Sequence, residues 1–428
     1  MTTEEQVEAL IRALREGGVQ GAAELRERLQ QPPTSFSRVV AAAGERVVRL
    51  GRTRATRYAL PRTYAGLRTP VRIRRIQPTG TLSDAGEMTP LATGQVWLEP
   101  AGGAGHLHDG LPPVAYDMAP AGYLGRRFAD RHPDLELPQR LQDWNDDHRL
   151  IALAHRGDDC PGDLIFGDES LQRYLDGEPV AVTRERYPAL AERSGSGGAG
   201  SSAAGEQPKF AAFVDGSHRL VKFSPGDGSP ADTRWRDLLV CEEIAAAILR
   251  DAGIEASNAQ VHDVGARRFL EVDRFDRVGA HGRRGVMTLG PIDDELFGSR
   301  DTWTRAGARL LEAGLLSVDD ARRIRLLEAF SILIDNSDRH FGNLAFYADG
   351  MAQRPSLVLA PAYDVLPMSL APVASSGVVP VPQRPTPRAQ VELIDVWEQA
   401  TQLAGGFWNV TAGDARLSDG FRRAAAGD

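Results

Sequence analysis

The sequence predicts an α+β fold in two parts, a small N-terminal domain made mostly of helices and a much larger mixed body. Apolar residues recur at helical spacing through the first 43 residues. After residue 206, strand–turn–strand patterns are followed by long helical patterns, and a glycine- and serine-rich run at 194–205 precedes them. A length of 428 residues agrees with two or three domains.

The composition is that of a globular protein from a reducing compartment. Hydrophobic residues make up 42% of the chain and charged residues 25%, which are ordinary values for such proteins. Cys160 and Cys241 are the only cysteines, which excludes a disulfide scaffold and a cysteine-rich zinc site. The N-terminus is acidic and unlike a signal peptide, and no apolar run of about 18 residues occurs. We therefore expect a cytoplasmic protein with no membrane partner.

The first 65 residues have the outline of a winged helix. Helical spacing predicts three helices, over 4–16, 22–29 and 34–43. Two short strands are expected next, over 46–50 and 57–60, with a turn between them. Three helices followed by a hairpin form the winged-helix variant of the helix-turn-helix. The sequence therefore predicts an N-terminal DNA-binding domain.

A strongly basic segment supports this prediction, although the whole chain has a net charge of −8. Residues 34–76 contain 11 arginines, and Glu45 is the only acid among them. Because guanidinium groups bind phosphates, we expect this segment to contact DNA and to associate the protein with the nucleoid. The expected DNA-binding residues are Arg38, Arg49, Arg52, Arg54 and Arg57. The alternative is a solvated basic hairpin in an arginine-rich protein.

The region after the glycine-rich run has the pattern of a phosphate-binding hairpin. Strands are expected over 209–214 and 220–223, on either side of the turn signal Asp215-Gly216. A helix is expected over 232–252, and a further strand over 269–275. A glycine loop before a hairpin can cover the phosphates of a nucleotide. By contrast, the stretch 148–167 is expected to be a helix end, a polar loop and a strand, with nothing that demands catalysis.

The residues that carry the chemistry come later in the chain. Asn343 follows Asp338 by five residues, and Asp364 follows Asn343 by 21. Phosphoryl transfer needs a carboxylate near the attacking hydroxyl, oxygen ligands for magnesium, and a cation on the phosphates. The D-x-x-x-x-N spacing matches the base and metal ligand of kinase catalytic loops, and Lys222 is placed like the strand lysine of kinases. The order predicts a two-lobed, protein-kinase-like fold that uses ATP and Mg²⁺.

Five motifs resemble the HipA family of bacterial serine/threonine kinases, which are toxins of toxin–antitoxin systems. Residues 338–343 resemble the family's D-x-H-x-x-N, and Tyr363-Asp364 resembles its Y-D pair. The other three are 202–209, similar to S-x-x-G-x-Q-x-K, 272–277, similar to V-E-R-F-D-R, and 157–162, similar to the G-R-D-C-x-G turn. The likeness covers about residues 100–370, and the motifs arrive in family order.

The resemblance implies a role for each matching residue. Asp338 would be the catalytic base or would orient the substrate hydroxyl, Asn343 and Asp364 would bind Mg²⁺, and Glu242 would be the acid of the first kinase helix. Asp273 and Phe275 would lie near adenine. The residues expected to bind ATP are Gln207, Lys209, Lys222, Asp273, Phe275 and His340. Ser202 would be a regulatory serine that the kinase autophosphorylates.

The chain departs from the family pattern in four places. Asp273 replaces the usual Glu, Gly342 stands where many members have Lys, and the segment after Met368 looks short and unlike the family's helical lobe. The N-terminal winged helix is also unusual, because the standard toxin borrows DNA binding from a separate antitoxin. In this respect the chain resembles the longer HipA-like subgroup labelled YjjJ or HipH.

The prediction is thus a toxin kinase that transfers the γ-phosphate of ATP to a protein hydroxyl and carries its own DNA-binding domain. An antitoxin is an expected further partner. Four domains are expected: a winged helix over 1–65, a HipA-like subdomain over 66–190, an ATP-binding lobe over 191–285 and a helical catalytic lobe over 286–428. The alternatives are a DNA-binding regulator with an inactive ATP-binding lobe, a small-molecule kinase, and a metal-dependent nuclease. The complete set of Lys222, Asp338, Asn343 and Asp364 favours the protein kinase.

Overall fold

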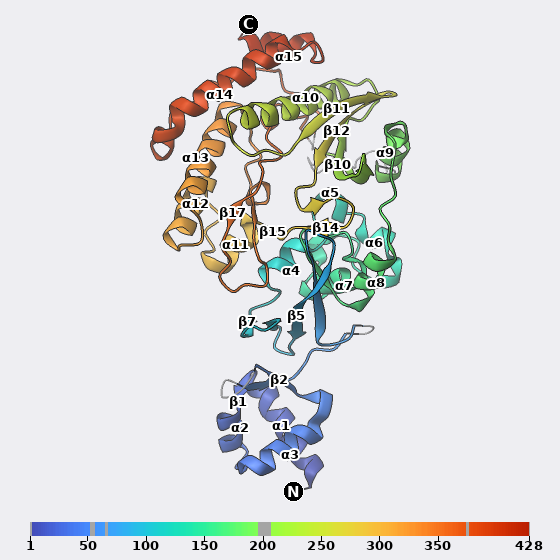
Figure 1. Ribbon diagram of the computed structural model, residues 1–428, viewed down its shortest axis with the longest axis vertical. Coiled ribbons are helices and arrows are strands. Elements are labelled where there is room, and N and C mark those ends of the chain that lie inside the picture. The colour runs from blue at the N-terminus through green and yellow to red at the C-terminus, as the bar shows by residue number, and fades with distance from the viewer. Residues whose placement is uncertain (1, 52–55, 65–66, 196–206, 374–375, 428) are drawn as a thin grey trace.

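The computed structural model describes residues 2–51, 56–64, 67–195, 207–373 and 376–427. The molecule is elongated, with the N-terminal helices at one end, a mixed middle region, and the last two helices at the other end (Figure 1). Ser202, Arg52 and Arg54 lie outside the described residues. No helix within the described ranges is long and apolar enough to span a membrane.

The N-terminal end contains three helices and a three-stranded antiparallel sheet in the order β1-β3-β2. The elements are α1 (Thr3–Gly17), β1 (Gln20–Gly21), α2 (Ala22–Arg28), α3 (Pro33–Ala43), β2 (Val48–Leu50) and β3 (Arg57–Ala59). Helix α1 begins with a capping box between Thr2 and Glu5. The apolar faces of the helices form a core of their own, which includes Leu10, Leu25 and Phe36. All the predicted elements are present, and the two-residue strand β1 is an addition.

The middle region is built on a five-stranded antiparallel sheet in the order β7-β6-β5-β4-β8. Its strands are β4 (Val71–Ile76), β5 (Leu82–Pro90), β6 (Val96–Pro100), β7 (His106–His108) and β8 (Leu164–Phe166). Its helices are α4 (Pro113–Met118), α5 (Gly122–Gly125), α6 (Phe128–Arg131), α7 (Asp146–Arg156) and α8 (Asp168–Asp176). The predicted order of helix, polar loop and strand over 148–167 is confirmed by α7 and β8.

The next region contains a four-stranded antiparallel sheet in the order β11-β12-β10-β9, with the long helix α10 packed against it (Figure 1). The elements are α9 (Tyr187–Gly195), β9 (Lys209–Val214), β10 (Ser217–Phe223), α10 (Pro230–Asp251), β11 (Ala259–Val264) and β12 (Arg267–Asp273). The predicted hairpin is confirmed, because Asp215 and Gly216 both have positive φ between β9 and β10. The strand expected over 269–275 ends two residues earlier, at Asp273.

The remaining chain is mainly helical, with two small sheets, β13-β14 and β15-β16-β17. The strands are β13 (Arg277–Val278), β14 (Gly282–Arg283), β15 (Val286–Thr288), β16 (Ala345–Tyr347) and β17 (Val358–Leu359). The helices are α11 (Leu289–Leu296), α12 (Trp303–Glu312), α13 (Val318–Leu333), α14 (Ile394–Gly413) and α15 (Asp419–Ala426). Helix α14 packs on α13 and α10, where Phe407 and Trp408 are buried. The C-terminal helices therefore belong to the core of the body.

One continuous apolar core runs from the middle sheet through α10 to α13 and α14, so these regions form a single packed body. The N-terminal domain contacts this body through a small separate cluster that joins Leu50 and Ala59 to Leu91 and Trp97. The N-terminal domain thus has its own core and a limited apolar contact with the rest.

Candidate active site

A buried lysine joins three separate elements at the centre of the body. Lys222 lies on β10 and is only 2% exposed. Its ammonium donates to both carboxylate oxygens of Glu242 on α10, at 2.6 and 2.7 Å, and it also contacts Oδ1 of Asp364. Asp364 lies in the loop after β17 and has a positive φ of 54°. The structure therefore brings together the predicted strand lysine, helix acid and metal-binding aspartate.

Lys222 and Asp364 stabilise each other's charge, whereas burial raises the pKa of Glu242 despite the contact with Lys222. Burial opposes the charged form of Lys222, but Asp364 and Glu242 outweigh it and raise the pKa of the lysine above its usual value. Burial likewise opposes ionisation of Asp364, but Lys222 and Lys209 together lower the pKa of that carboxyl to about 2. At neutral pH the lysine is therefore a cation and Asp364 an anion.

Asp338 lies in a loop that directly follows α13, and its side chain is 48% exposed. The loop turns sharply at Asp335, which has a φ of 64°. Two asparagines hold the backbone of Asp338: Oδ1 of Asn336 accepts its N–H at 3.1 Å, and Nδ2 of Asn343 donates to its carbonyl at 2.9 Å. The backbone is therefore fixed while the carboxylate stays open to a substrate.

Asn343 and His340 belong to the same loop as Asp338. Asn343 is buried, its Nδ2 donates to the carbonyl of Asp338, and no hydrogen bond joins its Oδ1 to another described residue, so this oxygen can accept a further ligand. His340 accepts the N–H of Gly342 at 3.0 Å through Nδ1, and its Nε2 lies 3.7 Å from Oδ1 of Asp338. The hydroxyl of Tyr363 donates to the carbonyl of Gly342 at 2.6 Å, which joins this loop to the segment that carries Asp364.

The two residues predicted at the phosphate loop lead into β9. Lys209 lies opposite Lys222 in the β9–β10 hairpin. Gln207 is buried, and its Nε2 has no hydrogen-bond partner among the described residues. A buried amide without a partner costs free energy, so an acceptor group of a bound molecule fits this position.

The two residues predicted near adenine have partners within the protein. Asp273, the last residue of β12, lies opposite Arg219 of β10 and forms an ion pair with it. The ring of Phe275 lies 5.6 Å from that of Tyr363 and 6.1 Å from that of Tyr347. Phe275 therefore belongs to an aromatic group beside Asp364, and the Asp273 carboxylate is engaged by an arginine.

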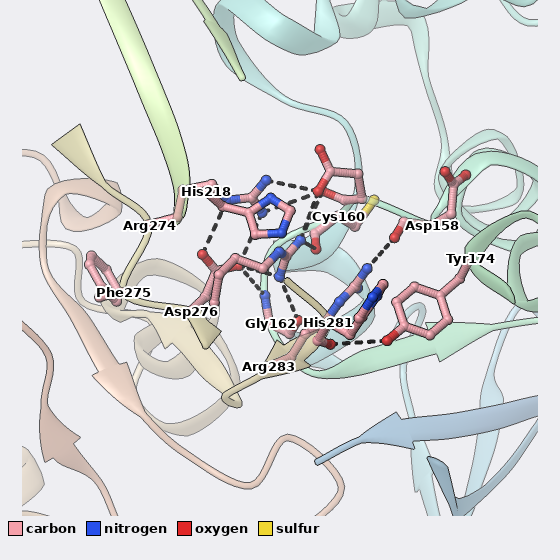
Figure 2. Close-up of polar contacts among 12 residues, drawn as sticks. Asp158, Cys160, Gly162, Tyr174, His218, Arg274, Phe275, Asp276, His281 and Arg283 are labelled. Atoms are coloured by element: carbon pink, nitrogen blue, oxygen red, sulfur yellow. Dashed lines mark hydrogen bonds and ion pairs between the residues drawn. The ribbon is translucent and has the colours of Figure 1, made fainter. Parts of the chain in front are cut away.

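A buried ion-pair group, which the sequence did not predict, joins the middle region to the segment after β12 (Figure 2). Asp276 is 6% exposed and accepts from Arg274 at 3.1 and 3.2 Å, from Arg277 at 2.6 Å, and from the N–H of Gly162 at 3.1 Å. Asp159 accepts from the same two arginines at 2.8 and 3.0 Å. We call these five residues the Asp276 cluster. They connect segments that are 114 to 118 residues apart in sequence.

Electrostatics explain why this cluster holds. Burial opposes ionisation of Asp276, but Arg274 and Arg277 outweigh it and keep the pKa of that carboxyl well below its usual range. Gly162 contributes backbone groups alone: its N–H donates to Asp276, its carbonyl accepts from Arg277 at 3.1 Å, and its φ of 84° favours glycine. The 157–162 and 272–277 motifs are thus parts of one contact, and that contact is structural, which agrees with the expectation that nothing in 148–167 demands catalysis.

The arginines predicted to bind DNA are only partly described. Arg38 on α3, Arg49 on β2 and Arg57 on β3 are exposed and form no ion pair within the described residues. Much of the basic segment is less free than the sequence suggested, because acids from other segments approach it. The arginines paired in this way are Arg46, Arg62, Arg68, Arg72, Arg74 and Arg75.

The residues around Lys222 have the chemistry that a magnesium-bound nucleoside triphosphate requires. A cation and an ionised carboxylate meet at Lys222 and Asp364, and the Asn343 amide lies in the Asp338 loop, which Tyr363 joins to the segment of Asp364. Groups of these kinds bind phosphate oxygens and Mg²⁺. Among the described residues no group of three or more His, Cys, Asp or Glu side chains could hold a metal alone.

Comparison with known proteins gives two family matches along the chain. Residues 67–175 match the YjjJ-like toxin middle domain, and residues 201–405 match the HipA-like C-terminal domain. The second match extends well past Met368. The expectation that the segment after Met368 departs from the family is therefore wrong, and the packing of α14 on α13 gives the physical reason.

A curated relative and a solved structure extend these matches. Toxin YjjJ of Escherichia coli (strain K12) is 35% identical over 430 residues, which cover 95% of this chain and 94% of the relative. The HipA protein of Shewanella oneidensis MR-1, solved with HipB and operator DNA, has 15% identity and a TM-score of 0.51, and the match covers 83% of this chain and 94% of that chain. The second likeness shows a shared fold. The identity with the YjjJ toxin over nearly the whole of both chains shows that this chain belongs to the YjjJ-like group of HipA-family toxins.

Proposed function

We propose that this toxin is an ATP- and Mg²⁺-dependent serine/threonine kinase that transfers the γ-phosphate of ATP to a hydroxyl of another protein. The observation that carries the proposal is the buried contact of Lys222 with Glu242 and Asp364. A strand lysine tied to a helix glutamate and facing a metal-binding aspartate is the arrangement on which protein kinases depend. Burying a lysine with two carboxylates gives little net stability, so apolar residues would fill these positions equally well if their only role were to pack the core.

Each residue of the site has a defined task in this mechanism. Lys222 binds phosphate oxygens of ATP, while Glu242 fixes the direction of its ammonium. Asp364 and Asn343 supply oxygen ligands to magnesium, which when bound neutralises charge on the phosphates. Asp338 accepts the proton of the attacking hydroxyl as that oxygen bonds to the γ-phosphorus and the bond from phosphorus to the ADP oxygen breaks.

The remaining predicted residues have supporting tasks. Gln207 and Lys209 contact the phosphates from the start of β9, and the unpartnered Nε2 of Gln207 supports this role. His340 and Phe275 lie close to the loops of Asp338 and Asp364, where they line the nucleotide site. Asp273 makes a weaker contact with adenine than an unpaired carboxylate would, because its carboxylate already forms an ion pair with Arg219. Ser202 is the proposed site of autophosphorylation.

The test is to incubate the purified chain with ATP and Mg²⁺, measure its intact mass, and map the modified residue. An added phosphate that is absent from the Asp338→Ala variant would support the kinase, and a phosphate on Ser202 would support an autoregulated loop. A regulator with an inactive lobe predicts ATP binding without added mass, even with candidate acceptor proteins present. A metal-dependent nuclease predicts cleavage of plasmid DNA that needs Mg²⁺ but not ATP.

We also propose that residues 1–65 form a winged-helix domain that binds DNA. Three helices and the sheet β1-β3-β2 support this, as do Arg38, Arg49 and Arg57, which are exposed and form no ion pair with any residue that the structure describes. Binding should weaken steeply with salt, and Arg57→Ala should reduce the slope of log affinity against log salt by about 1. Arg46→Ala is the matched control, because Arg46 is already paired with Glu4 and Glu8. Equal slopes for both variants would argue against a DNA contact at Arg57.

The kind of antitoxin partner follows from this second proposal. The HipA structure is a complex with HipB and its operator DNA. A chain with its own DNA-binding domain can perform the DNA-binding part of that assembly itself, so we propose that any antitoxin of this toxin acts by inhibiting the kinase lobe. Co-purification of a small protein from the native host that inhibits transfer without adding DNA affinity would support this proposal.

A further inference from the structure

We propose that Asn336 is a positioning residue that sets the catalytic base and the metal-binding aspartate relative to each other. This inference rests on the proposed kinase function. Neither the sequence motifs nor the family resemblance assigned a role to Asn336, although it lies two residues before Asp338.

Asn336 is anchored to a rigid element. It is 1% exposed, and its backbone N–H donates to the carbonyl of Ser331 in α13 at 2.8 Å. Its own carbonyl accepts from the guanidinium of Arg339. The position of the Asn336 side chain is therefore fixed by the end of a helix that is itself buried in the core of the body.

The side-chain amide of Asn336 reaches both catalytic segments. Its Oδ1 accepts the N–H of Asp338 at 3.1 Å, and its Nδ2 lies 3.5 Å from the carbonyl oxygen of Asp364, at the long end of the hydrogen-bond range. An amide offers an acceptor and a donor on one planar group, so it can bridge an N–H and a carbonyl in a way that an ionised Asp or an Ala cannot. Asn336 thus joins the backbones of two aspartates that are 26 residues apart in the printed sequence.

A second contact beside it supports a positioning role for this part of the loop. The N–H of Ser369 donates to the carbonyl of Asp335 at 3.2 Å, and the Ser369 hydroxyl contacts the Asp335 carboxylate. Asp335 and Asn336 together therefore connect the loop of Asp338 to Asp364 itself and to the chain after it. Asp338 positions the attacking hydroxyl, and the ligands of magnesium position the phosphate. A displacement of about 1 Å between these two loops therefore costs on the order of 100-fold in rate.

The test compares Asn336→Ala and Asn336→Asp with the native full-length chain in steady-state ATP-dependent transfer. Asn336→Ala is expected to lower kcat on the order of 100-fold, with the KM for ATP changed by less than about threefold, because Lys222 still binds the phosphates. Asn336→Asp keeps the acceptor for the Asp338 N–H but places a second acceptor against the Asp364 carbonyl. Its kcat should fall about tenfold, and the Mg²⁺ concentration for half-maximal rate should rise.

The matched control is Asn409→Ala, which makes the same change at an exposed position on α14. A merely structural role would lower the thermal midpoint without separating kcat from KM or changing the Mg²⁺ dependence. Native-like kcat in Asn336→Ala, or a loss confined to the KM for ATP, would overturn the inference. If Asn336→Ala does not fold, native-like kcat and Mg²⁺ dependence in Asn336→Asp would overturn it. A native chain that transfers no phosphate to itself or to acceptors would overturn the proposed function, and this inference with it.

Discussion

Removal of the Asp276 carboxylate should destabilise the body of the protein strongly. In Asp276→Ala, Arg274 and Arg277 lose a shared buried counter-ion, and the N–H of Gly162 loses its acceptor. Removing one partner of a buried ion pair costs about 3–5 kcal/mol, since the other charge stays buried without compensation. Asp159 still contacts both arginines and is 58% exposed, so it can adjust toward them. We therefore expect a loss near the lower limit, about 3 kcal/mol in the free energy of unfolding.

A urea titration followed by tryptophan fluorescence measures this loss. The matched control is Asp143→Ala, which removes an exposed carboxylate that also makes two contacts with one arginine, Arg140, at 2.9 and 3.2 Å. Exposed pairs of this kind contribute about 0–1 kcal/mol. If the unfolding midpoint of Asp276→Ala lies with that of Asp143→Ala, then the cluster does not stabilise the body and our reasoning about its buried charges is wrong.

Three further predictions test the site, the charges and the N-terminal core. Lys222→Met should lower kcat for phosphate transfer by about 100- to 1000-fold, because a preorganised cation at the phosphates is lost, and steady-state kinetics with an unchanged kcat would contradict this. Burial, partly offset by Arg75 and reinforced by Asp349, raises the pKa of Asp163 to about 6. This pKa lies above the unfolded value of about 3.9, so the ionisation of Asp163 lowers the stability of the folded chain as the pH rises from 4 to 6. In urea titrations, the free energy of unfolding of Asp163→Asn should therefore gain about 2 kcal/mol relative to that of the native chain between pH 4 and pH 7.5. A pH-independent difference would show that Asp163 does not titrate there. Leu10→Ala should cost the N-terminal domain about 2–5 kcal/mol and abolish DNA binding while phosphate transfer continues, because the two parts have separate cores. Loss of both activities would show that the cores are coupled.

Local patterns predicted the secondary structure around the site well. The β9–β10 hairpin could be predicted because Asp215-Gly216 accepts positive φ between two strand patterns. The loop of Asp338 and Asn343 could be predicted because its chemistry lies within six consecutive residues. The two-residue strand β1 could not, since two residues carry no periodic signal.

Contacts between segments that lie far apart in the chain could not be predicted from the sequence. Asp276 and Asp159 belong to motifs that the resemblance identified, but no local pattern indicated that these motifs touch. The free charge of the basic segment was overestimated for the same reason, since Arg46 is paired by acids of α1 that precede it by about 40 residues. Asn336 could have been found as a side chain able to accept the N–H two residues later, which is a common local role for asparagine.

The separate core of the N-terminal domain has a consequence for the order in which the protein matures on the ribosome. All of that core lies within the first 60 residues, whereas the site needs Asp364 to meet Lys222 across 142 residues of chain. At about 5–20 residues per second, the ribosome adds the intervening 300 or so residues in about 15–60 s. During that time a nascent toxin presents a folded N-terminal domain and no assembled site. Any factor that recognises this domain can therefore bind each molecule before it becomes toxic.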